Sequence, residues 1–289
     1  MFYMKERKEQ VAVVVVTYNR KEMLKKNIDC LLKQTYKPAK IIVVDNHSTD
    51  GTKAEFESFF KKNKIDYIYM KKNLGGAGGF SKGIDYATKA GYDYIWGMDD
   101  DAFPEKEALE ELMKAKKTFS EEVCLWSGET RKEEYPKSGL KEVEEWAFVG
   151  FFIPTSIVKK IGLPRSDFFI YFDDFEYADR VKTVAKTKIY RVQASRIKHD
   201  VGDGKMLEKT IFGKRLEILS MPNWKMYYHT RNRLLMYKWS DFKKWKQLFR
   251  YNPPAFIKLL LIRPSQAGMF LYGQLHGILG ISGKRVNPK

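Results

Sequence analysis

Cysteine is scarce in this sequence, and the patterns that mark secretion or membrane insertion are missing. There are 2 cysteines in 289 residues, Cys30 and Cys124, and their spacing matches no metal site. So few cysteines indicate a reducing compartment, and we expect both in the core. The N-terminus has no apolar run before its charges, and no later window approaches the roughly 20 apolar residues of a membrane span. We therefore expect a cytoplasmic protein without a transmembrane helix.

Two standard nucleotide-binding motifs are also absent. A dinucleotide-binding fold carries Gly-x-Gly-x-x-Gly after its first strand, but here the first apolar run is followed by Thr17-Tyr18-Asn19. A P-loop needs Gly-Lys-Ser/Thr, which occurs nowhere in the chain. Any nucleotide site must therefore be built in another way.

Acidic residues are nearly missing from the C-terminal part. Residues 223–289 hold 13 Lys+Arg against one acid, Asp241, and so carry +12 of the formal net charge of +17. Several apolar side chains there are predicted to share one helical stripe, namely Leu235, Trp239, Phe242, Trp245 and Phe249. Such a helix either lies on an anionic membrane surface or packs against the rest of the protein. We expect no nucleic-acid partner, because the acidic strand ends described below would repel phosphates.

What the sequence has in plenty is core material, arranged as alternating strands and helices. It is 44% hydrophobic and 15% aromatic, and Val11 to Val16 is an unbroken apolar run typical of a strand buried on both faces. Strands are predicted at 11–16, 41–44, 65–70 and 92–98, with helices between them. This alternation predicts an α/β fold with a mostly parallel sheet and right-handed crossovers.

Polar residues follow four of these strands, and they include three consecutive carboxylates. The residues are Thr17, Asn19, Asp45, Asn73, Asp99, Asp100 and Asp101. Because ligands bind beyond the carboxyl ends of parallel strands, we expect these side chains to converge on one crevice. Three adjacent carboxylates repel one another in a low-dielectric site, which favours a bound Mg²⁺ or Mn²⁺. The alternative is a solvated acidic turn before a helix that Pro104 opens.

The remaining segments do not follow this simple alternation. A glycine-rich turn at Gly75–Gly79 either cradles a pyrophosphate or only lets the chain turn tightly. A helix is expected from Pro104 to Lys117, a strand at 123–127 and an irregular surface loop from 129 to 145.

A second group of carboxylates follows an aromatic segment. The segment from Phe168 is predicted to be a strand that runs into Asp173, Asp174 and Glu176 at the start of a helix. A helix cap accounts for one of these acids but not for all three. A carboxylate held against aromatic walls has a raised pKa, as a general base requires. His199 closes a later strand and is either a metal ligand or a surface histidine.

Taken together, these segments resemble family 2 glycosyltransferases with the Rossmann-like GT-A fold. The resemblance spans about Val11 to Asn232 and is carried by the segments 13–20, 43–52, 73–80, 99–101, 172–176 and 228–232. It implies a catalytic domain at 1–222, with a nucleotide-sugar half at about 1–128 and an acceptor half at about 129–222. Residues 223–289 would then form a basic, aromatic, helical extension.

The resemblance also assigns roles to single residues. It implies donor binding by Thr17, Asn19, Arg20, Asp45, Asn73, Gly75, Gly76, Asp99 and Asp100, with Asp45 accepting from the imide N–H of uracil or thymine. It implies that Asp101 and His199, together with Asp99, ligate Mn²⁺ or Mg²⁺. Asp174 would be the catalytic base, with Asp173 and Glu176 beside it.

Within the family, the glycine-rich block and the triple aspartate are most similar to bacterial galactofuranosyltransferases. They imply inverting transfer of galactofuranose from a UDP-sugar donor to a glycan or lipid-linked glycan acceptor in cell-surface polysaccharide synthesis, on the inner face of the membrane. Two alternatives remain, namely a rhamnosyltransferase that uses dTDP-rhamnose and a non-catalytic module that binds a nucleotide or an anionic surface. The acceptor and the oligomeric state are not predicted.

Overall fold

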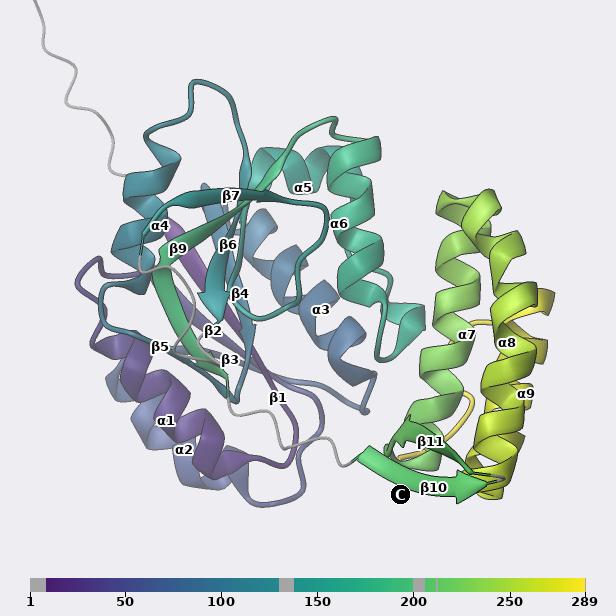
Figure 1. Ribbon diagram of the computed structural model, residues 1–289. Helices are drawn as coiled ribbons and strands as arrows, with labels where there is room; N and C mark the ends of the chain where they lie inside the picture. The colour runs from purple at the N-terminus through teal and green to yellow at the C-terminus, as the bar shows by residue number, and fades with distance from the viewer. Residues whose placement is uncertain (1–8, 130–137, 200–205, 212, 289) are drawn as a thin grey trace, which may run out of the picture.

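The computed structural model of this chain describes residues 9–129, 138–199, 206–211 and 213–288. It has a central sheet with helices on both faces, and a group of three long helices stands beside the sheet (Figure 1). The predicted α/β class is confirmed, and so is the helical character of the C-terminal part.

The N-terminal half is a parallel sheet in the order β3-β2-β1-β4. Its strands are β1 (Val11–Thr17), β2 (Lys40–Asp45), β3 (Asp66–Tyr69) and β4 (Tyr94–Asp99), and they alternate with α1 (Lys21–Leu32), α2 (Thr52–Lys62) and α3 (Gly75–Lys89). Side chains of β1 alternate between two apolar clusters, one under α1 and α2 and the other under α3. Both faces are therefore covered, which explains why the β1 run is apolar at every position.

Beyond β4 the sheet is mixed. The order continues β4-β8-β6-β9-β5, and β7 also pairs with β9. The strands are β5 (Ala102–Pro104), β6 (Cys124–Glu129), β7 (Leu140–Val143), β8 (Phe151–Pro154) and β9 (Ile189–His199), with helices α4 (Ala108–Lys116), α5 (Thr155–Ile161) and α6 (Asp173–Thr183). β8 is antiparallel to both β4 and β6, whereas β6 and β9 are parallel. The prediction of a mostly parallel sheet therefore describes the first four strands best.

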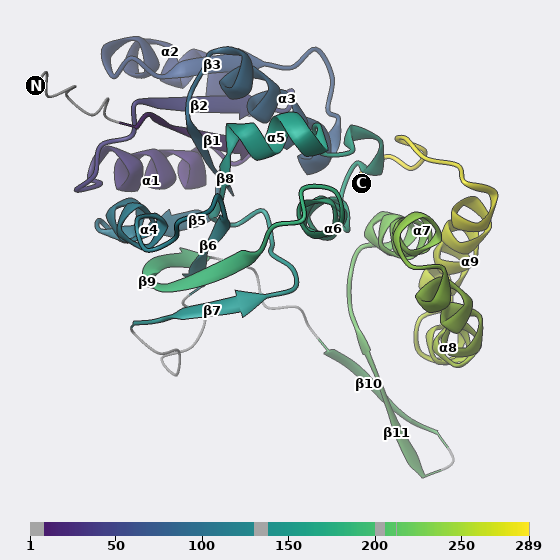
Figure 2. The same ribbon diagram turned by 90° about the horizontal axis from the view of Figure 1, so that it is seen from above.

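The C-terminal part is a hairpin followed by three helices. The hairpin strands β10 (Met206–Ile211) and β11 (Lys214–Leu219) project from the body, and α7 (Asn223–Ser240), α8 (Phe242–Ile262) and α9 (Pro264–Leu279) pack together (Figure 2). Gly273 lets α9 approach α7 closely, because a Cβ there would lie 2.6 Å from the carbonyl oxygen of Tyr227. None of the described helices combines the length and the apolar character needed to cross a membrane.

Two local predictions about the N-terminal half were wrong. Gly75–Gly79 is not a turn but the beginning of α3. Its glycines serve packing, because a Cβ at Gly79 would lie 2.5 Å from the Val16 side chain. Pro104 does not open a helix either; it ends β5, and α4 begins at Ala108.

Three later predictions were also wrong. The expected irregular loop at 129–145 contains β7, and residues 130–137 lie outside the described part. The aromatic segment is not a strand, because the short 3₁₀ helix Ser166–Phe168 is followed by a turn with positive φ at Phe169, Tyr171 and Phe172. The single stripe of 235–249 is broken at Asp241, whose carboxylate caps α8 by accepting from the Lys244 N–H.

Candidate active site

The carboxyl ends of β1, β2 and β4 bring the first group of predicted residues together. The register places Thr17 beside Asp45 and Val16 beside Asp99. The Thr17 hydroxyl donates to Oδ2 of Asp100 at 2.7 Å. Arg20 Nη1 lies 2.5 Å from Oδ2 of Asp101 and 3.4 Å from Oδ1 of Asp100. The predicted convergence of these strand ends is therefore present.

The pKa values of the three consecutive carboxyl groups differ because their neighbouring charges and hydrogen-bond partners differ. Burial and the neighbouring charges of Asp101 and Asp100 raise the pKa of Asp99 well above its usual value. Burial also raises the pKa of Asp100 to about 6, although Thr17 and Arg20 oppose it. Burial acts in the same direction on Asp101, but His199 and Arg20 outweigh it and leave its pKa lowered. Asp101 is thus the acid of the three that stays ionised most readily.

Asp101 and His199 meet because β5 pairs with β9. The pairing sets Ala102 opposite His199, and Nε2 of His199 lies 3.2 Å from Oδ1 of Asp101. This buried oxygen accepts no well-aligned hydrogen bond from the part of the chain that the structure describes. Within that part, no group of three or more His, Cys, Asp or Glu side chains could enclose a metal ion. Two protein ligands nevertheless fit Mg²⁺ or Mn²⁺, since such ions are often completed by water and substrate phosphates.

Asp45 is engaged within the protein. It is fully buried, and its two oxygens accept from the Ser48 N–H at 2.7 Å and from the Tyr67 hydroxyl at 2.5 Å. Burial and the Asp45 charge raise the pKa of Tyr67, which therefore stays a donor. A hydrogen bond from the imide N–H of a nucleobase to Asp45 thus stays a prediction, and it requires sharing or displacing one of these donors.

Asn19 and Asn46 tie the polar loops to one another. Oδ1 of Asn19 accepts from the Thr49 N–H at 2.7 Å, so this predicted donor-binding residue joins the loops after β1 and β2. Asn46, which sequence reasoning did not single out, donates to the carbonyl oxygen of Gly75 at 2.6 Å and accepts from the Leu74 N–H at 2.9 Å. These bonds fix the start of α3 at the carboxyl edge of the sheet.

The glycines at the start of α3 have different surroundings. Gly75 has φ +75°, and a Cβ there would lie 1.9 Å from the carbonyl oxygen of Phe169. Gly76 has nothing within 4 Å of its Cβ position. Oδ1 of Asn73 accepts from the Gly75 N–H at 2.8 Å. Packing against Phe169 therefore requires glycine at position 75, whereas the space beside Gly76 could hold a side chain.

The second group of carboxylates lies at the start of α6. Burial, Asp174 and also Asp99 raise the pKa of Asp173 well above its usual value. Burial raises the pKa of Asp174 to about 6, while backbone N–H groups of Phe175 and Phe148 favour its charged form. The Phe175 N–H lies 2.9 Å from Oδ1 of Asp174. The raised pKa favours the protonated form of Asp173, whereas the two backbone N–H groups favour the charged form of Asp174.

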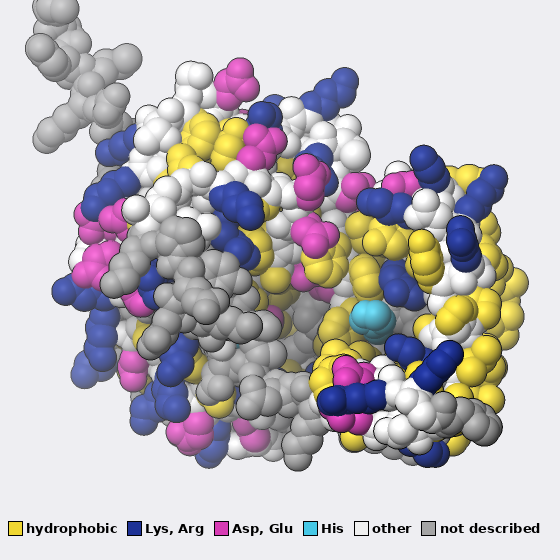
Figure 3. Space-filling model, viewed as in Figure 1, with side chains coloured by type: hydrophobic (Ala, Val, Ile, Leu, Met, Phe, Trp, Pro, Cys, Tyr) yellow, Lys and Arg dark blue, Asp and Glu magenta, His cyan; other side chains and the backbone are white. Residues whose placement is uncertain are grey.

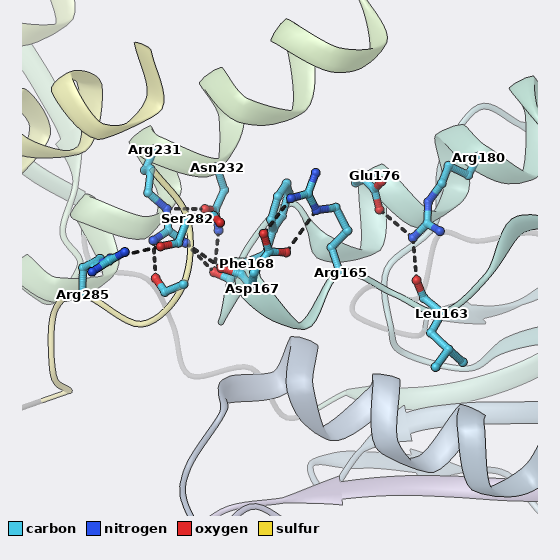
Figure 4. A network of polar contacts seen from close by, with 11 residues as sticks. Leu163, Arg165, Asp167, Phe168, Glu176, Arg180, Arg231, Asn232, Ser282 and Arg285 are labelled. Atoms are coloured by element: carbon cyan, nitrogen blue, oxygen red, sulfur yellow. Dashed lines mark hydrogen bonds and ion pairs between the residues drawn. The ribbon is translucent and has the colours of Figure 1, made fainter. Parts of the chain in front are cut away.

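Glu176 does not join this pair. Its carboxylate forms an ion pair of 2.9 Å with Arg180, one helical turn further along α6. Arg180 also donates to the carbonyl oxygen of Ile161, and to that of Leu163 as Figure 4 shows. The burial of Glu176 raises its pKa and Arg180 opposes this effect. The geometry gives Glu176 a structural contact and leaves its predicted catalytic role a prediction.

Sequence reasoning did not assign a role to two residues of α7, Asn232 and His229. Nδ2 of Asn232 donates to the carbonyl oxygens of Phe168, Ile170 and Tyr171, at 2.8 to 2.9 Å. His229 packs edge-on against Tyr171, and burial with the Arg233 charge lowers its pKa to about 4, so its imidazole is neutral. The segment 228–232 carried part of the family resemblance, and that was the available signal.

Lys225 was also missed, and it brings a further positive charge toward the site. Burial and the charge of Arg20 lower its pKa, whereas Asp101 raises it. The first turn of α7 therefore lies within electrostatic range of both residues. A lone lysine in a basic segment gives no sequence signal for this placement.

The arrangement combines two chemical capabilities at one sheet edge. Around Asp101 it offers metal-ligating oxygens, an imidazole and cations that match phosphate groups. Around Asp174 it offers a partly buried carboxylate that accepts protons near neutral pH. The interaction between Asp99 and Asp173 links the two groups. Such a site suits the removal of a proton from one substrate and the departure of a phosphate from another.

Comparison with known proteins places this geometry in a wider context. The profile of glycosyl transferase family 2 matches residues 12–216. The chain is 38% identical over 96 residues to galactofuranosyltransferase GlfT1 of Mycolicibacterium smegmatis, which is 33% of this chain and 31% of that protein. It is 36% identical over 103 residues to the amylovoran biosynthesis glycosyltransferase AmsB of Erwinia amylovora, or 35% and 33% of the two chains. The matches thus span about a third of the length of these curated relatives.

Two solved structures share the fold. GalNAc-T7 with UDP, GalNAc and Mn²⁺ aligns with a TM-score of 0.64 at 14% identity, covering 96% of this chain and 58% of that one. TarS 1–349 of S. aureus in complex with UDP aligns with a TM-score of 0.56 at 14% identity, covering 94% and 92%. The predicted GT-A fold is therefore confirmed.

Proposed function

This chain belongs to glycosyl transferase family 2, and on that premise we propose that it is an inverting, metal-dependent glycosyltransferase of bacterial cell-surface polysaccharide synthesis. The observation that carries the proposal is the meeting of two carboxylate groups from distant parts of the chain, Asp99–Asp101 and Asp173–Asp174. Displacement of a nucleoside diphosphate needs a cation-rich side for the leaving group and a base on the acceptor side. Arg20 and Lys225 near Asp101 support the first role, and Asp174 supports the second.

We propose that the donor is UDP-galactofuranose. The support is the similarity to GlfT1, which is named a galactofuranosyltransferase. Both structural neighbours were also solved with UDP. Thr17, Asn19 and Arg20 would hold the nucleotide with Asp45, and Asn73, Gly75, Gly76, Asp99 and Asp100 would complete the donor site. A rhamnosyltransferase that uses dTDP-rhamnose is the alternative within the family.

Asp101 and His199, with Asp99 nearby, would hold Mn²⁺ or Mg²⁺. When bound, the ion would stabilise the negative charge that develops on the departing diphosphate. The protein adds charge of its own, because Arg20 is ion-paired with Asp101 and Lys225 lies within electrostatic range of both. A phosphate that reached this place would draw both cations toward it. If Arg20 left Asp101 to bind the phosphate, donor binding would fix the position of the Arg20 side chain.

Asp174 would act as the base. Its pKa of about 6 leaves it ionised at neutral pH and still basic enough to take the proton of an acceptor hydroxyl as that oxygen attacks. The neighbouring charges of Asp174 and Asp99 raise the pKa of Asp173, which favours its protonated form and makes Asp173 a poorer candidate for the base. Attack from the side opposite the leaving diphosphate inverts the anomeric carbon. The new bond forms to the acceptor oxygen while the bond to the diphosphate oxygen breaks.

We also propose that the C-terminal helices bind an anionic membrane surface. Exposed apolar side chains gather on α8 and α9, namely Phe242, Phe249, Ile257, Leu260, Leu271, Tyr272, Leu275 and Leu279. Figure 3 shows hydrophobic side chains along much of the edge of the molecule over these helices. No acidic residue occurs from 242 to 289, whereas Lys243, Lys246 and Arg250 lie among the apolar positions of α8. An apolar face with basic residues only suits anionic lipid headgroups.

A panel of nucleotide sugars tests the proposed activity. The protein is incubated with each donor and Mn²⁺, and nucleotide release is measured with and without polyprenyl-linked glycans. Release from UDP-galactofuranose, with calorimetric binding of UDP stronger than that of GDP, is the expected result. Tighter GDP binding would contradict the donor assignment. Binding of UDP without release from any donor would favour the non-catalytic binding module instead.

A further inference from the structure

We propose that the segment Ser282–Val286, here called the strap, acts with Tyr228 and Arg231 of α7 to position the turn that leads into Asp173 and Asp174. The inference rests on the proposed function, since it concerns the placement of the proposed base. It assigns these residues a positioning role and no direct contact with the reacting atoms. It also gives a function to part of the C-terminal region that the family profile does not reach.

The turn needs support from other segments because its backbone conformation is energetically unfavourable. Phe169, Tyr171 and Phe172 all have positive φ, at 68°, 67° and 63°. Bulky side chains rarely adopt this left-handed conformation, which persists where surrounding contacts over-determine it. The last of the three is immediately followed by Asp173. A relaxation of the turn would therefore move both acids at the start of α6.

One part of the support comes from α7. Asn232 binds three carbonyl oxygens of the turn and its approach. Nη2 of Arg231, which is fully buried, donates to the carbonyl oxygens of Asp167 at 3.2 Å and Phe168 at 3.0 Å. Its guanidinium also lies over the Tyr228 ring, 4.8 Å from the centroid. The buried charge is thus satisfied by carbonyl oxygens and aromatic faces.

The strap completes this support. The Gly283 N–H donates to the carbonyl oxygen of Asp167 at 2.7 Å, and Nη1 of Arg231 donates to the Gly283 carbonyl oxygen at 2.5 Å. Hydrogen bonds from Arg165 and Ser282 hold the pKa of Asp167 below its usual range even though its burial acts to raise it. Figure 4 shows Ser282, Asp167 and Arg231 gathered at one point. Removal of the strap would leave the Arg231 guanidinium and Asp167 without these partners.

Tyr228 holds the strap in place. Its hydroxyl donates to the Val286 carbonyl oxygen at 2.8 Å and accepts from the N–H groups of Arg285 and Val286, each at 3.1 Å. Its ring packs against Phe169 with 4.8 Å between centroids. One side chain therefore touches both the strap and the strained turn.

The strap also reaches the donor side. Nζ of Lys284 lies 3.4 Å from the carbonyl oxygen of Asn73 and 5.2 Å from the centre of the Phe169 ring. Phe169 in turn accepts from the Ala77 N–H at 3.2 Å through its carbonyl oxygen. The strap thus connects the segment that begins α3 with the turn that begins α6. The strap therefore fixes the proposed donor-binding residues and the proposed base relative to each other.

The test uses Tyr228→Phe, with Tyr227→Phe as the matched control. Tyr227 is the adjacent buried tyrosine, and its hydroxyl bonds Nδ1 of His276 on α9 and interacts with Arg231, whereas the hydroxyl of Tyr228 bonds the strap. Each variant loses one hydroxyl and keeps its ring. We expect Tyr228→Phe to lower kcat about tenfold, while the UDP affinity in Mn²⁺ changes less than about twofold, because misplacement of a base affects the chemical step. Tyr227→Phe should leave kcat within about twofold of the unaltered protein.

The pH profile adds a readout that a loss of stability alone does not produce. A relaxed turn admits water to Asp174, so its pKa falls and the acid limb of kcat moves to lower pH in Tyr228→Phe. The limb should not move in Tyr227→Phe. Equal kcat values, or equal acid limbs, in the two variants would overturn the proposal.

A measurement without turnover separates this inference from the proposed function. Amide hydrogen exchange across 166–177 should be faster in Tyr228→Phe than in Tyr227→Phe at matched overall stability. If no sugar donor gives turnover but exchange differs as expected, the proposed function fails and the strap remains. If exchange is the same in both variants, the strap does not hold the turn. Gly283→Ala provides a second variant, since its φ of +83° strains alanine although nothing lies within 4 Å of the Cβ.

Discussion

Asp99 at the end of β4 and Asp173 at the start of α6 lie close enough for the charge of one to raise the pKa of the other. They are distant in the sequence, and one ends a strand of the sheet whereas the other begins a helix. Their proximity joins the cation-binding side of the site to the side that holds the proposed base. It also means that both acids cannot be ionised together without a large electrostatic cost.

Asp174→Asn should abolish most turnover and leave donor binding intact. The substitution keeps the shape of the side chain and removes the proton acceptor, so kcat should fall by about 10²- to 10⁴-fold. Calorimetry with UDP and Mn²⁺ should give an unchanged affinity. Asp173→Asn is the control, because a protonated acid is well mimicked by an amide. A large loss in Asp173→Asn with normal turnover in Asp174→Asn would move the base by one residue.

Turnover should fall in acid with a midpoint near pH 6. The folded pKa of Asp174 is raised to about 6, so the base is ionised above this pH and protonated below it. Activity is therefore present at pH 7.5 and is lost as the pH drops through 6. A kcat profile from pH 5 to 8.5 at saturating donor measures it. A midpoint near the ordinary pKa of aspartate, about 4, would show that Asp174 is not the base.

Asp101→Ala and His199→Ala should weaken metal-dependent donor binding. Each change removes one proposed ligand, so the UDP affinity in Mn²⁺ should fall by at least about tenfold and recover in part at high Mn²⁺. His276→Ala is the matched control, since His276 bonds Tyr227 on α7, far from Asp101 in the sequence. If neither chelation of the metal nor the Asp101→Ala substitution changed the UDP affinity, a metal ion at this place would be refuted.

Gly75→Ala and Gly76→Ala should differ sharply in stability. A Cβ at Gly75 would lie 1.9 Å from the Phe169 carbonyl oxygen and would require φ of +75°, so the free energy of unfolding should drop by about 2–4 kcal/mol. A Cβ at Gly76 meets nothing, and alanine is the better helix former. Urea unfolding of both variants checks this. Similar midpoints would mean that α3 begins differently from the structure described here.

Two glutamates on α9 should remove membrane binding. Leu271 and Leu275 are 46% and 53% exposed, and charges there oppose insertion between lipids. The double variant should no longer float with phosphatidylglycerol vesicles at low salt. Val184→Glu, at a position 54% exposed at the C-terminal end of α6, should float like the unaltered protein. If the unaltered protein does not float, the α8–α9 face binds something other than lipid.

The parts of the site that could be predicted are those that follow strand ends. Asp99–Asp101 and Thr17 were found because an apolar run marks a parallel strand, and parallel strands end at one edge. Arg20 was named only through the family resemblance, and the structure places it in ion pairs with Asp101 and Asp100.

Other parts depend on contacts that no local pattern encodes. The aromatic residues from Phe168 favour a strand by propensity, but Asn232 and Arg231 hold the backbone in a turn instead. The glycines of α3 have low helix propensity, yet the closeness of Gly79 to Val16 requires them in the helix. The stripe after Leu235 was broken by Asp241, a residue with a strong capping preference that the periodicity of apolar residues does not detect.

The hydrogen bond between Gly283 and Asp167 also constrains the order of folding. It closes a very long loop, so its entropic cost is offset only after α7, α8 and α9 have brought the strap to the sheet. The sheet and helices can form earlier from more local contacts, with the turn at 169–172 still free to sample ordinary φ values. During refolding from urea, the helical circular dichroism signal should therefore return before turnover does. Competence for chemistry is then the last property that this chain acquires.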